Sequence, residues 1–216
     1  MLELDALEVN IGSASILRQV DLSIPVGALS GLIGRNGAGK TTLMRCVMGL
    51  LDAKGGGIRV GGKSLTGVPA HGRAGLGIGY MPEDRRLIPD FTVEENVLVP
   101  AWAGKQQDTA ARLDWVFGLM PEVREFRTRR ASQLSGGQQK LVALARALMA
   151  GRKLLLLDEP FEGVAPALAQ RLAEVLSDLK GSGITVLVAD SNEKHIADLL
   201  TTMHVIERGA IRKASG

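Results

Sequence analysis

The alternation of apolar and polar positions along the chain predicts an α/β protein. Residues 2–9 and 16–24 alternate apolar and polar side chains, which is typical of strands with one buried face. The segments 29–33, 153–157 and 184–189 are short and apolar, which indicates strands buried on both faces. Because such strands form parallel sheets when helices separate them, we expect a mostly parallel central sheet behind an antiparallel N-terminal β subdomain.

Apolar residues at helical spacing occupy the regions between these strands. They predict one helix at 41–51, which we expect the three glycines at 55–57 to close, and another at 167–179. Two further helical patterns lie at 93–98 and 109–119. The helices are therefore spread along the chain in the alternating order of an α/β fold.

The middle of the chain differs from its two ends. Residues 83–150 carry helical patterns and little strand pattern, and four arginines in 124–130 are interpreted as a solvated connector. We therefore expect a single domain, 1–216, in which a helical subdomain, 83–150, is inserted into an α/β core made of 1–82 and 151–216. A closing hairpin is predicted near residues 207–209.

Composition limits the possible functions without choosing one. The chain has 216 residues, of which 45% are hydrophobic, and this suits one soluble domain. We find no apolar run near the roughly 18 residues that cross a bilayer and no leader pattern, so other chains would supply any membrane span. The net charge of +3 is too small to indicate nucleic acid. The single cysteine, Cys46, excludes an intrachain disulfide, and its apolar neighbours favour a core position.

A glycine-rich loop follows the predicted strand at 29–33. It has the sequence GRNGAGKT and fits the pattern G-x-x-x-x-G-K-[ST]. Its glycines let backbone N–H groups approach phosphates, and the helix behind it adds a positive N-terminal end. In such a loop Lys40 reaches the β- and γ-phosphates, and the hydroxyl of Thr41 binds Mg²⁺. We expect this loop to hold ATP through Gly34, Asn36, Gly37, Ala38, Gly39, Lys40, Thr41 and Thr42.

Two carboxylates end the predicted strand at 153–157. Asp158 and Glu159 follow four leucines, which places them at the carboxyl end of a strand, where ligands bind in open α/β sheets. Asp158 is suited to hold Mg²⁺, and Glu159 to polarise the attacking water as general base. The alternative, two carboxylates that only cap a strand, is weaker because a phosphate loop lies upstream.

A second candidate phosphate cradle lies at 134–138, where LSGGQ precedes a helix. Its glycines allow close approach, and Ser135 can hydrogen-bond a phosphate oxygen beside the positive helix end. With this motif the chain resembles the ABC ATPase family over essentially its whole length. The resemblance implies the P-loop NTPase fold of that family, with ATP sandwiched between two subunits. One subunit would supply the phosphate loop and the other would supply Ser135, Gly136, Gly137 and Gln138.

A third loop connects the nucleotide with the membrane partner in that family. Its usual Gln corresponds here to Glu83, which can still bind a cation but adds a negative charge. The segments 82–89, 92–96 and 162–166 are similar to the branched-chain amino acid uptake ATPases. This resemblance implies an importer of branched-chain or hydrophobic amino acids, with urea and short-amide importers as near relatives.

Two positions depart from the family pattern. The family stacks adenine on an aromatic residue, but the matching residue is Ile11, and no Phe, Tyr or Trp precedes Tyr80. An aromatic partner is worth on the order of 1 kcal/mol, so we expect weak nucleotide binding with little preference for ATP over GTP. The switch position, commonly His or Gln, holds Ser191, which carries no charge, so we expect slow hydrolysis. We interpret His195 as a surface residue.

Three functions are compatible with the sequence. The leading one is the ATPase subunit of an ABC importer, using ATP and Mg²⁺ and forming a homodimer or heterodimer with a second ABC ATPase subunit. It would bind membrane permease subunits at the cytoplasmic face of the inner membrane and reach a substrate-binding protein only indirectly. A soluble ABC ATPase acting on nucleic acid is disfavoured, because the spacing of Lys40 and Asp158 leaves no room for a coiled coil. Ile11 and Ser191 keep open a slow or binding-only subunit of a heterodimer.

Overall fold

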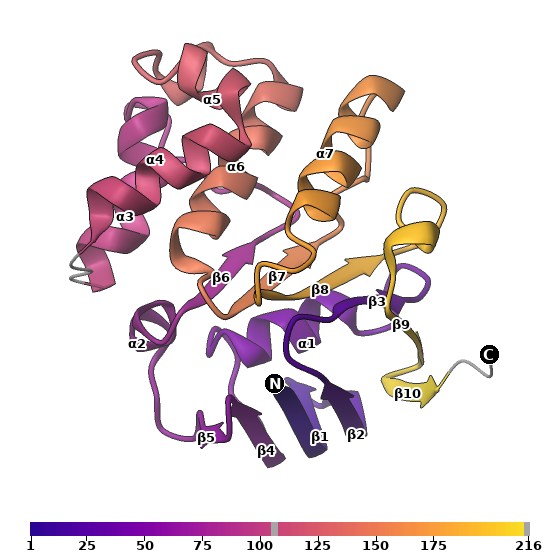
Figure 1. Cartoon of the computed structure of the whole chain (residues 1–216). Coiled ribbons are helices and arrows are strands. Elements are labelled where there is room, and N and C mark those ends of the chain that lie inside the picture. Colours follow the sequence, from indigo (N-terminus) through magenta and orange to yellow (C-terminus); the bar gives the residue numbers. More distant parts are fainter. Residues whose placement is uncertain (105–107, 214–216) are drawn as a thin grey trace.

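The computed structural model describes residues 1–104 and 108–213 as two sheets with helices around them (Figure 1). The first sheet is antiparallel, in the order β2-β1-β4-β5. The second has the order β10-β9-β3-β8-β7-β6 and is parallel except for β10. The first comprises β1 (Leu2–Ile11), β2 (Ala14–Ile24), β4 (Gly55–Val60) and β5 (Lys63–Ser64). The second comprises β3 (Leu29–Ile33), β6 (Ile78–Met81), β7 (Leu154–Asp158), β8 (Thr185–Asp190), β9 (Thr202–Glu207) and β10 (Ala210–Lys213).

These sheets confirm the predicted fold class. Every strand expected from the apolar pattern is present, and the segment around 207–209 forms the turn of the β9–β10 hairpin. The strands of the second sheet that lie in its centre, β3, β7 and β8, are buried along their whole length. This burial explains why their sequences are apolar on both faces.

Helix α1 (Lys40–Val47) lies between the two sheets. Leu43, Met44 and Val47 are fully buried, and they share an apolar cluster with β1, β2, β4 and one face of the parallel sheet. Helices on the opposite face of the parallel sheet form a second apolar cluster with it. Because α1 packs against the N-terminal sheet on one side and the parallel sheet on the other, its position is fixed. The glycine-rich loop that leads into this helix is fixed with it.

Helices from the middle of the chain lie at the end of the molecule away from the N-terminal sheet (Figure 1). They are α3 (Val93–Gly104), α4 (Thr109–Leu119), α5 (Pro121–Glu125), the 3-10 turn η1 (Ala131–Gln133) and α6 (Gly136–Ala150). Helix α2 (Ala70–Gly75) precedes β6, whereas α7 (Pro166–Asp178) and the 3-10 turn η2 (Ala197–Leu199) belong to the last third of the chain. Helix α6 packs against α3 and α4 and also against β6 and β7, so it joins the helical part to the core. The subdomain boundaries at 83 and 150 stay a prediction.

Three local expectations were wrong. Helix α1 ends at Val47, not at residue 51, because the chain turns at Gly49, which has a φ of 70°. The glycines at 55–57 do not close this helix but form the start of β4. Gly56 has a φ of 81°, and a Cβ there would lie 2.3 Å from the carbonyl oxygen of Ala6, so the close approach to β1 requires glycine. The helix predicted at 93–98 continues through Gly104.

Two further expectations concern burial and membrane insertion. Cys46 lies in the core with 1% of its surface exposed, as predicted. Within the described ranges, no helix combines the length and apolarity needed to cross a bilayer.

Candidate functional site

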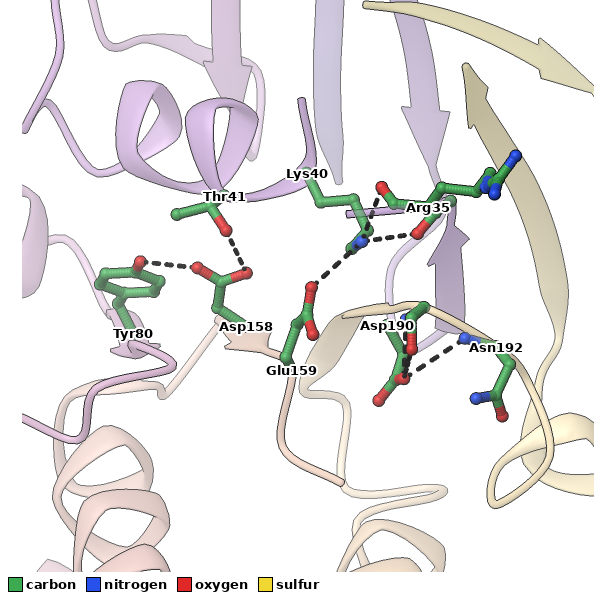
Figure 2. Close-up of polar contacts among 10 residues, drawn as sticks. Arg35, Lys40, Thr41, Tyr80, Asp158, Glu159, Asp190 and Asn192 are labelled. Atoms are coloured by element: carbon green, nitrogen blue, oxygen red, sulfur yellow. Dashed lines mark hydrogen bonds and ion pairs between the residues drawn. The ribbon is translucent and has the colours of Figure 1, made fainter. Parts of the chain in front are cut away.

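The candidate residues gather where the central strands end (Figure 2). The backbone N–H of Gly34, which follows β3, donates to the carbonyl oxygen of Asp190 at the end of β8, at 3.1 Å. The backbone N–H of Glu159, which follows β7, donates to the carbonyl oxygen of Ala189 at 2.8 Å. Neighbouring strands therefore bring the glycine-rich loop and the two consecutive carboxylates to one edge of the sheet.

The glycine-rich loop leaves the start of α1 open to an anion. Gly39 is the N-cap residue with a φ of 113°, and no side chain caps the helix. A Cβ on Gly39 would lie 2.9 Å from a methyl carbon of Leu17, so space as well as conformation requires glycine. The first N–H groups of α1 are thus available to phosphate oxygens at the positive end of the helix.

Lys40 and Glu159 form a buried ion pair in this loop (Figure 2). The Lys40 ammonium lies 3.1 Å from Glu159 Oε1, and the two side chains are 3% and 7% exposed. The ammonium also donates to the carbonyl oxygens of Gly34 and Arg35, at 2.5 and 3.3 Å. Burial opposes ionisation of Glu159, but hydrogen bonds with Glu162 and Lys40 and the charge of Lys40 outweigh it and lower its pKa. Glu159 is therefore a carboxylate in this arrangement.

Asp158 is fully buried and accepts two hydrogen bonds from side chains. Its Oδ1 accepts from the hydroxyl of Thr41 and its Oδ2 from the hydroxyl of Tyr80, each at 3.1 Å (Figure 2). Burial raises the pKa of Asp158 to about 6, although both hydrogen bonds act to lower it. A proton therefore competes with any cation that this carboxylate binds below about pH 6.

The donors around Asp158 suit Mg²⁺. Thr41, Glu83 and Asp158 line one cavity of about 240 Å³, together with Tyr80 and Arg45. A hydroxyl and two carboxylates are hard oxygen ligands, and a site with few protein ligands suits a cation that keeps water and binds phosphates. To bind such a cation, the Thr41 hydroxyl would exchange its bond to Asp158 for the metal.

A neighbouring cavity collects the phosphate-loop residues. It has a volume of about 210 Å³ and is lined by Ile16, Gly37, Gly39, Lys40, Thr41, Thr42 and Glu159. The structure thus brings the loop and the candidate base around one space. Ile16 was not expected from the sequence, because an apolar residue in an alternating strand gives no sign that it faces a ligand. Ile11 lies at the end of β1 and is 49% exposed.

Ser191 points toward its neighbour in the chain. It is exposed, and its hydroxyl and backbone N–H donate to Asp190 Oδ1 at 3.4 and 2.7 Å. The hydroxyl is thus engaged by Asp190. His195 is exposed, as expected, and its ring stacks on Phe161 with centroids 5.3 Å apart.

The second cradle forms the start of α6. Ser135 Oγ accepts from the backbone N–H of Gln138 at 3.3 Å, and Gln138 Oε1 accepts from the backbone N–H of Ser135 at 3.1 Å. This reciprocal capping leaves the Ser135 hydroxyl hydrogen free to donate to an anion. Residues 135–138 line neither of the two cavities described above. Within one chain the two cradles are therefore separate.

Besides Ile16, the side chains of Tyr80 and Lys140 contact the site without having been expected from the sequence. Tyr80 reaches Asp158 because β6 pairs with β7. Lys140, on α6, donates to the carbonyl oxygen of Glu159 at 3.1 Å. A signal for Lys140 was present, since Ala143 and Leu144 place it on the apolar stripe of α6.

Known proteins resemble this chain in sequence and in structure. The model of the ABC transporter family matches residues 17–162. The high-affinity branched-chain amino acid transport ATP-binding protein BraG of Pseudomonas aeruginosa is 36% identical, over 98% of this chain and 91% of its own. The lipopolysaccharide export system ATP-binding protein LptB of Haemophilus influenzae is 33% identical, over 92% and 83%. A solved nucleotide-free ATP-binding cassette from an ABC transporter matches with a TM-score of 0.84 at 27% identity, covering 98% of this chain and 89% of that one.

Proposed function

This chain belongs to the ABC transporter family and is an ATPase, and from that premise we propose that it is the motor subunit of an importer for branched-chain or other hydrophobic amino acids. The observation that carries the proposal is the 36% identity to BraG over 98% of the chain. LptB, whose name refers to export, is 33% identical over 92% of the chain. Because this margin is small, the experiment must separate import from export.

The experiment measures transport directly. The chain is produced with the membrane subunits that co-purify with it from its host and placed in proteoliposomes with a binding protein for the compound tested. We expect ATP-dependent uptake of labelled leucine, and none with the Glu159→Gln variant. Uptake of urea in place of leucine would assign the chain to the urea and short-amide importers instead. A permease pair that moves neither compound inward, but supports lipid or glycolipid export, would overturn the importer assignment.

The ion pair between Lys40 and Glu159 supports a specific order of events at the site. To bind the β- and γ-phosphates, Lys40 must give up its bonds to the carbonyl oxygens of the loop and to Glu159. That exchange leaves the Glu159 carboxylate free to accept a proton from the attacking water. Thr41, Asp158 and Glu83 would hold Mg²⁺, which neutralises charge on the phosphates when bound. Nucleotide binding would then release the base in the same step.

The separation of the two cradles supports a dimeric site. Residues 135–138 of a second subunit, the same chain or a close relative, would complete the site built on Lys40 and Glu159. We expect Glu159→Gln to slow hydrolysis at least about 100-fold and to accumulate ATP-bound dimers, measured by sedimentation. Glu159→Gln that hydrolyses ATP as fast as the native chain would refute the assignment of the base.

An exposed apolar surface near Glu83 suits the permease. Leu50 is 43% exposed and lines the cavity that contains Glu83, while Ile88 and Trp102 are 36% and 52% exposed. Phe91 joins the last two, because its backbone bonds to Ile88 and its ring meets Trp102 edge to face. Large apolar side chains that are exposed side by side are typical of docking surfaces. We expect Trp102→Glu to abolish co-purification with the permease and to leave the hydrolysis rate of the isolated chain within twofold of the native rate. Such a result would support the proposed location of the chain at the inner face of the membrane.

A further inference from the structure

Lys140 is a buried cation whose ammonium contacts the loop that carries Glu159. The residue is 5% exposed and lies one turn into α6. Its Nζ donates to the carbonyl oxygen of Glu159 at 3.1 Å and to that of Glu162 at 2.7 Å. A buried ammonium is costly unless it is paired and hydrogen-bonded, so these two carbonyl groups are its main compensation.

The loop that Lys140 contacts is held in an unfavourable backbone conformation. Glu159 has a φ of 50°, which a residue with a Cβ rarely adopts. Its backbone N–H is bound to β8, and the backbone N–H of Glu162 closes the turn by donating to the Glu159 carbonyl oxygen at 3.3 Å. Such a conformation persists only where surrounding contacts determine it. Lys140 supplies two of those contacts, one on the Glu159 carbonyl oxygen that closes the turn and one on the carbonyl oxygen of Glu162.

We propose that Lys140 is a positioning residue, which fixes the turn at Glu159 and makes the direction of the general base depend on helix α6. The proposal rests on the proposed role of Glu159 as base. It does not require Lys140 to touch the nucleotide.

Burial and nearby charges act in opposite directions on the pKa of Lys140, and the net effect lowers it. Burial and the neighbouring Arg85 lower its pKa, whereas the carboxylates of Glu162, Asp190 and Glu83 act in the opposite direction. A neutral side chain of similar length would remove the side-chain donor from both carbonyl groups and the nearby cation from the surrounding acidic side chains. Substitution of Lys140 should therefore disturb the turn at Glu159. The disturbance should be larger when the positive charge is lost than when only the side-chain volume changes.

Helix α6 also holds the loop that carries Glu83. Arg85 Nη1 donates to the carbonyl oxygen of Gly136 at 3.3 Å and to Gln139 Oε1 at 3.2 Å. Further along α6, Arg146 donates to the backbone carbonyl oxygens of Arg85 and Arg86. The first turns of α6 are therefore bonded to both loops of this chain's own site.

Ser135, at the start of α6, lies five positions from Lys140, which is about 7.5 Å along a helix axis. If Ser135 contacts nucleotide held by the partner, a shift of α6 would reach Glu159 through Lys140. One helix would then link the two composite sites of a dimer.

The test compares Lys140→Met with Lys140→Arg. Lys180→Met is the matched control at an exposed lysine, and Glu159→Gln is the reference for loss of the base. All are measured as full-length chains for steady-state hydrolysis, equilibrium ATP binding and hydrogen exchange of the peptide covering residues 159–163. For Lys140→Met we expect kcat to fall about 10- to 100-fold, which is the loss of hydrogen bonds from a charged donor, while the Kd for ATP changes less than twofold. Exchange at the Glu162 amide should become faster. Lys140→Arg should recover most of kcat, and Lys180→Met should match the native chain.

The outcomes separate this inference from the proposed function. If Lys140→Met keeps native kcat while Glu159→Gln is inactive, the positioning role is wrong and the base assignment stands. If Glu159→Gln remains active, the base assignment itself is wrong. If Lys140→Met lowers kcat, ATP affinity and thermal stability together, Lys140 is a structural residue only and the inference is overturned. Should Lys140→Met fail to fold, Lys140→Gln is measured by the same three assays against the same criteria.

Discussion

Removing one oxygen atom at Tyr80 should weaken metal binding in a way that depends on pH. The Tyr80 hydroxyl donates to Asp158 Oδ2 at 3.1 Å, and Asp158 has no exposed surface. Tyr80→Phe keeps the ring and deletes this donor, leaving one carboxylate oxygen without its side-chain partner. The ionised form of Asp158 is the form that loses, because the hydroxyl stabilises the charge.

The size of the effect follows from the hydrogen bond and the pKa. A hydrogen bond to a charged group is worth about 1.5–3 kcal/mol, and about 1.4 kcal/mol corresponds to one pKa unit. The pKa of Asp158, already raised to about 6 by burial, should rise by about one to two further units. Near pH 7 about half to nine-tenths of the variant's Asp158 would be protonated, so the Mg²⁺ concentration for half-maximal activity should increase about 2- to 10-fold. At pH 8.5 the carboxylate is largely ionised in both proteins, and the difference should shrink.

The assay is a Mg²⁺ titration of ATP hydrolysis at pH 6.5, 7 and 8.5, with binding of Mn²⁺ followed by electron paramagnetic resonance as a measure independent of turnover. Tyr80 is the only tyrosine in the chain, so absorbance near 295 nm reports its ionisation alone. Burial and the charge of Asp158 raise the pKa of Tyr80, so the native protein should not show this signal until it unfolds in alkali.

Two results would refute this reasoning. An unchanged Mg²⁺ midpoint at pH 7 would mean that the hydroxyl does not stabilise the ionised Asp158. A defect of equal size at pH 7 and pH 8.5 would mean that Tyr80 acts on the site by another route, such as the position of β6. Thr41→Ser, which retains the hydroxyl that donates to Asp158, serves as the control and should keep the native pH profile.

Three further predictions concern other parts of the chain. Ile11→Tyr places an aromatic ring at a half-exposed strand end, so the Kd for ATP in a fluorescence titration should fall about 2- to 10-fold, and an unchanged Kd would exclude base stacking there. Ser191→His supplies a residue that can carry charge, and kcat should rise about tenfold or more; no increase would show that the switch position does not limit turnover. Arg73→Met removes four hydrogen bonds to backbone carbonyl groups, two of them in the last turns of α1, and should lower the free energy of unfolding by about 2–4 kcal/mol in urea titrations. A loss below about 1 kcal/mol would mean that water replaces the guanidinium.

The sequence could predict those parts of the site whose chemistry is continuous along the chain. The phosphate loop from Gly34 to Thr42 is one segment, and its glycines, lysine and threonine imply their own geometry. Asp158 and Glu159 end a strand that is apolar throughout, so their place at the sheet edge follows from the pattern alone. These positions need no knowledge of how distant segments pack.

The contacts between distant segments could not be predicted in the same way. The bond from Tyr80 to Asp158 depends on the pairing of β6 with β7, and a shift of one residue would turn Tyr80 to the other face. The bond from Lys140 to Glu159 depends on the rotation of α6 against the sheet. Gly56 was misassigned because a glycine required for close approach to a neighbouring strand has the same sequence signal as one that ends a helix. Each of these features is decided by tertiary packing.

The two lysines that contact Glu159 differ in what nucleotide binding does to them. Lys40 touches the carboxylate and lowers its pKa, and this same ammonium is the one that the β- and γ-phosphates would attract. When Lys40 moves to the phosphates, the carboxylate loses its closest cation, and its pKa must rise toward the range of an effective general base. Lys140 touches the carbonyl oxygen of Glu159 and not the carboxylate, so it can hold the turn throughout this exchange. On the proposed roles, the ammonium that pairs with the carboxylate and the ammonium that holds the turn belong to different residues. Only Lys40 would move to the phosphates of ATP, whereas Lys140, whose charge also lowers the pKa of Glu159, would stay in place.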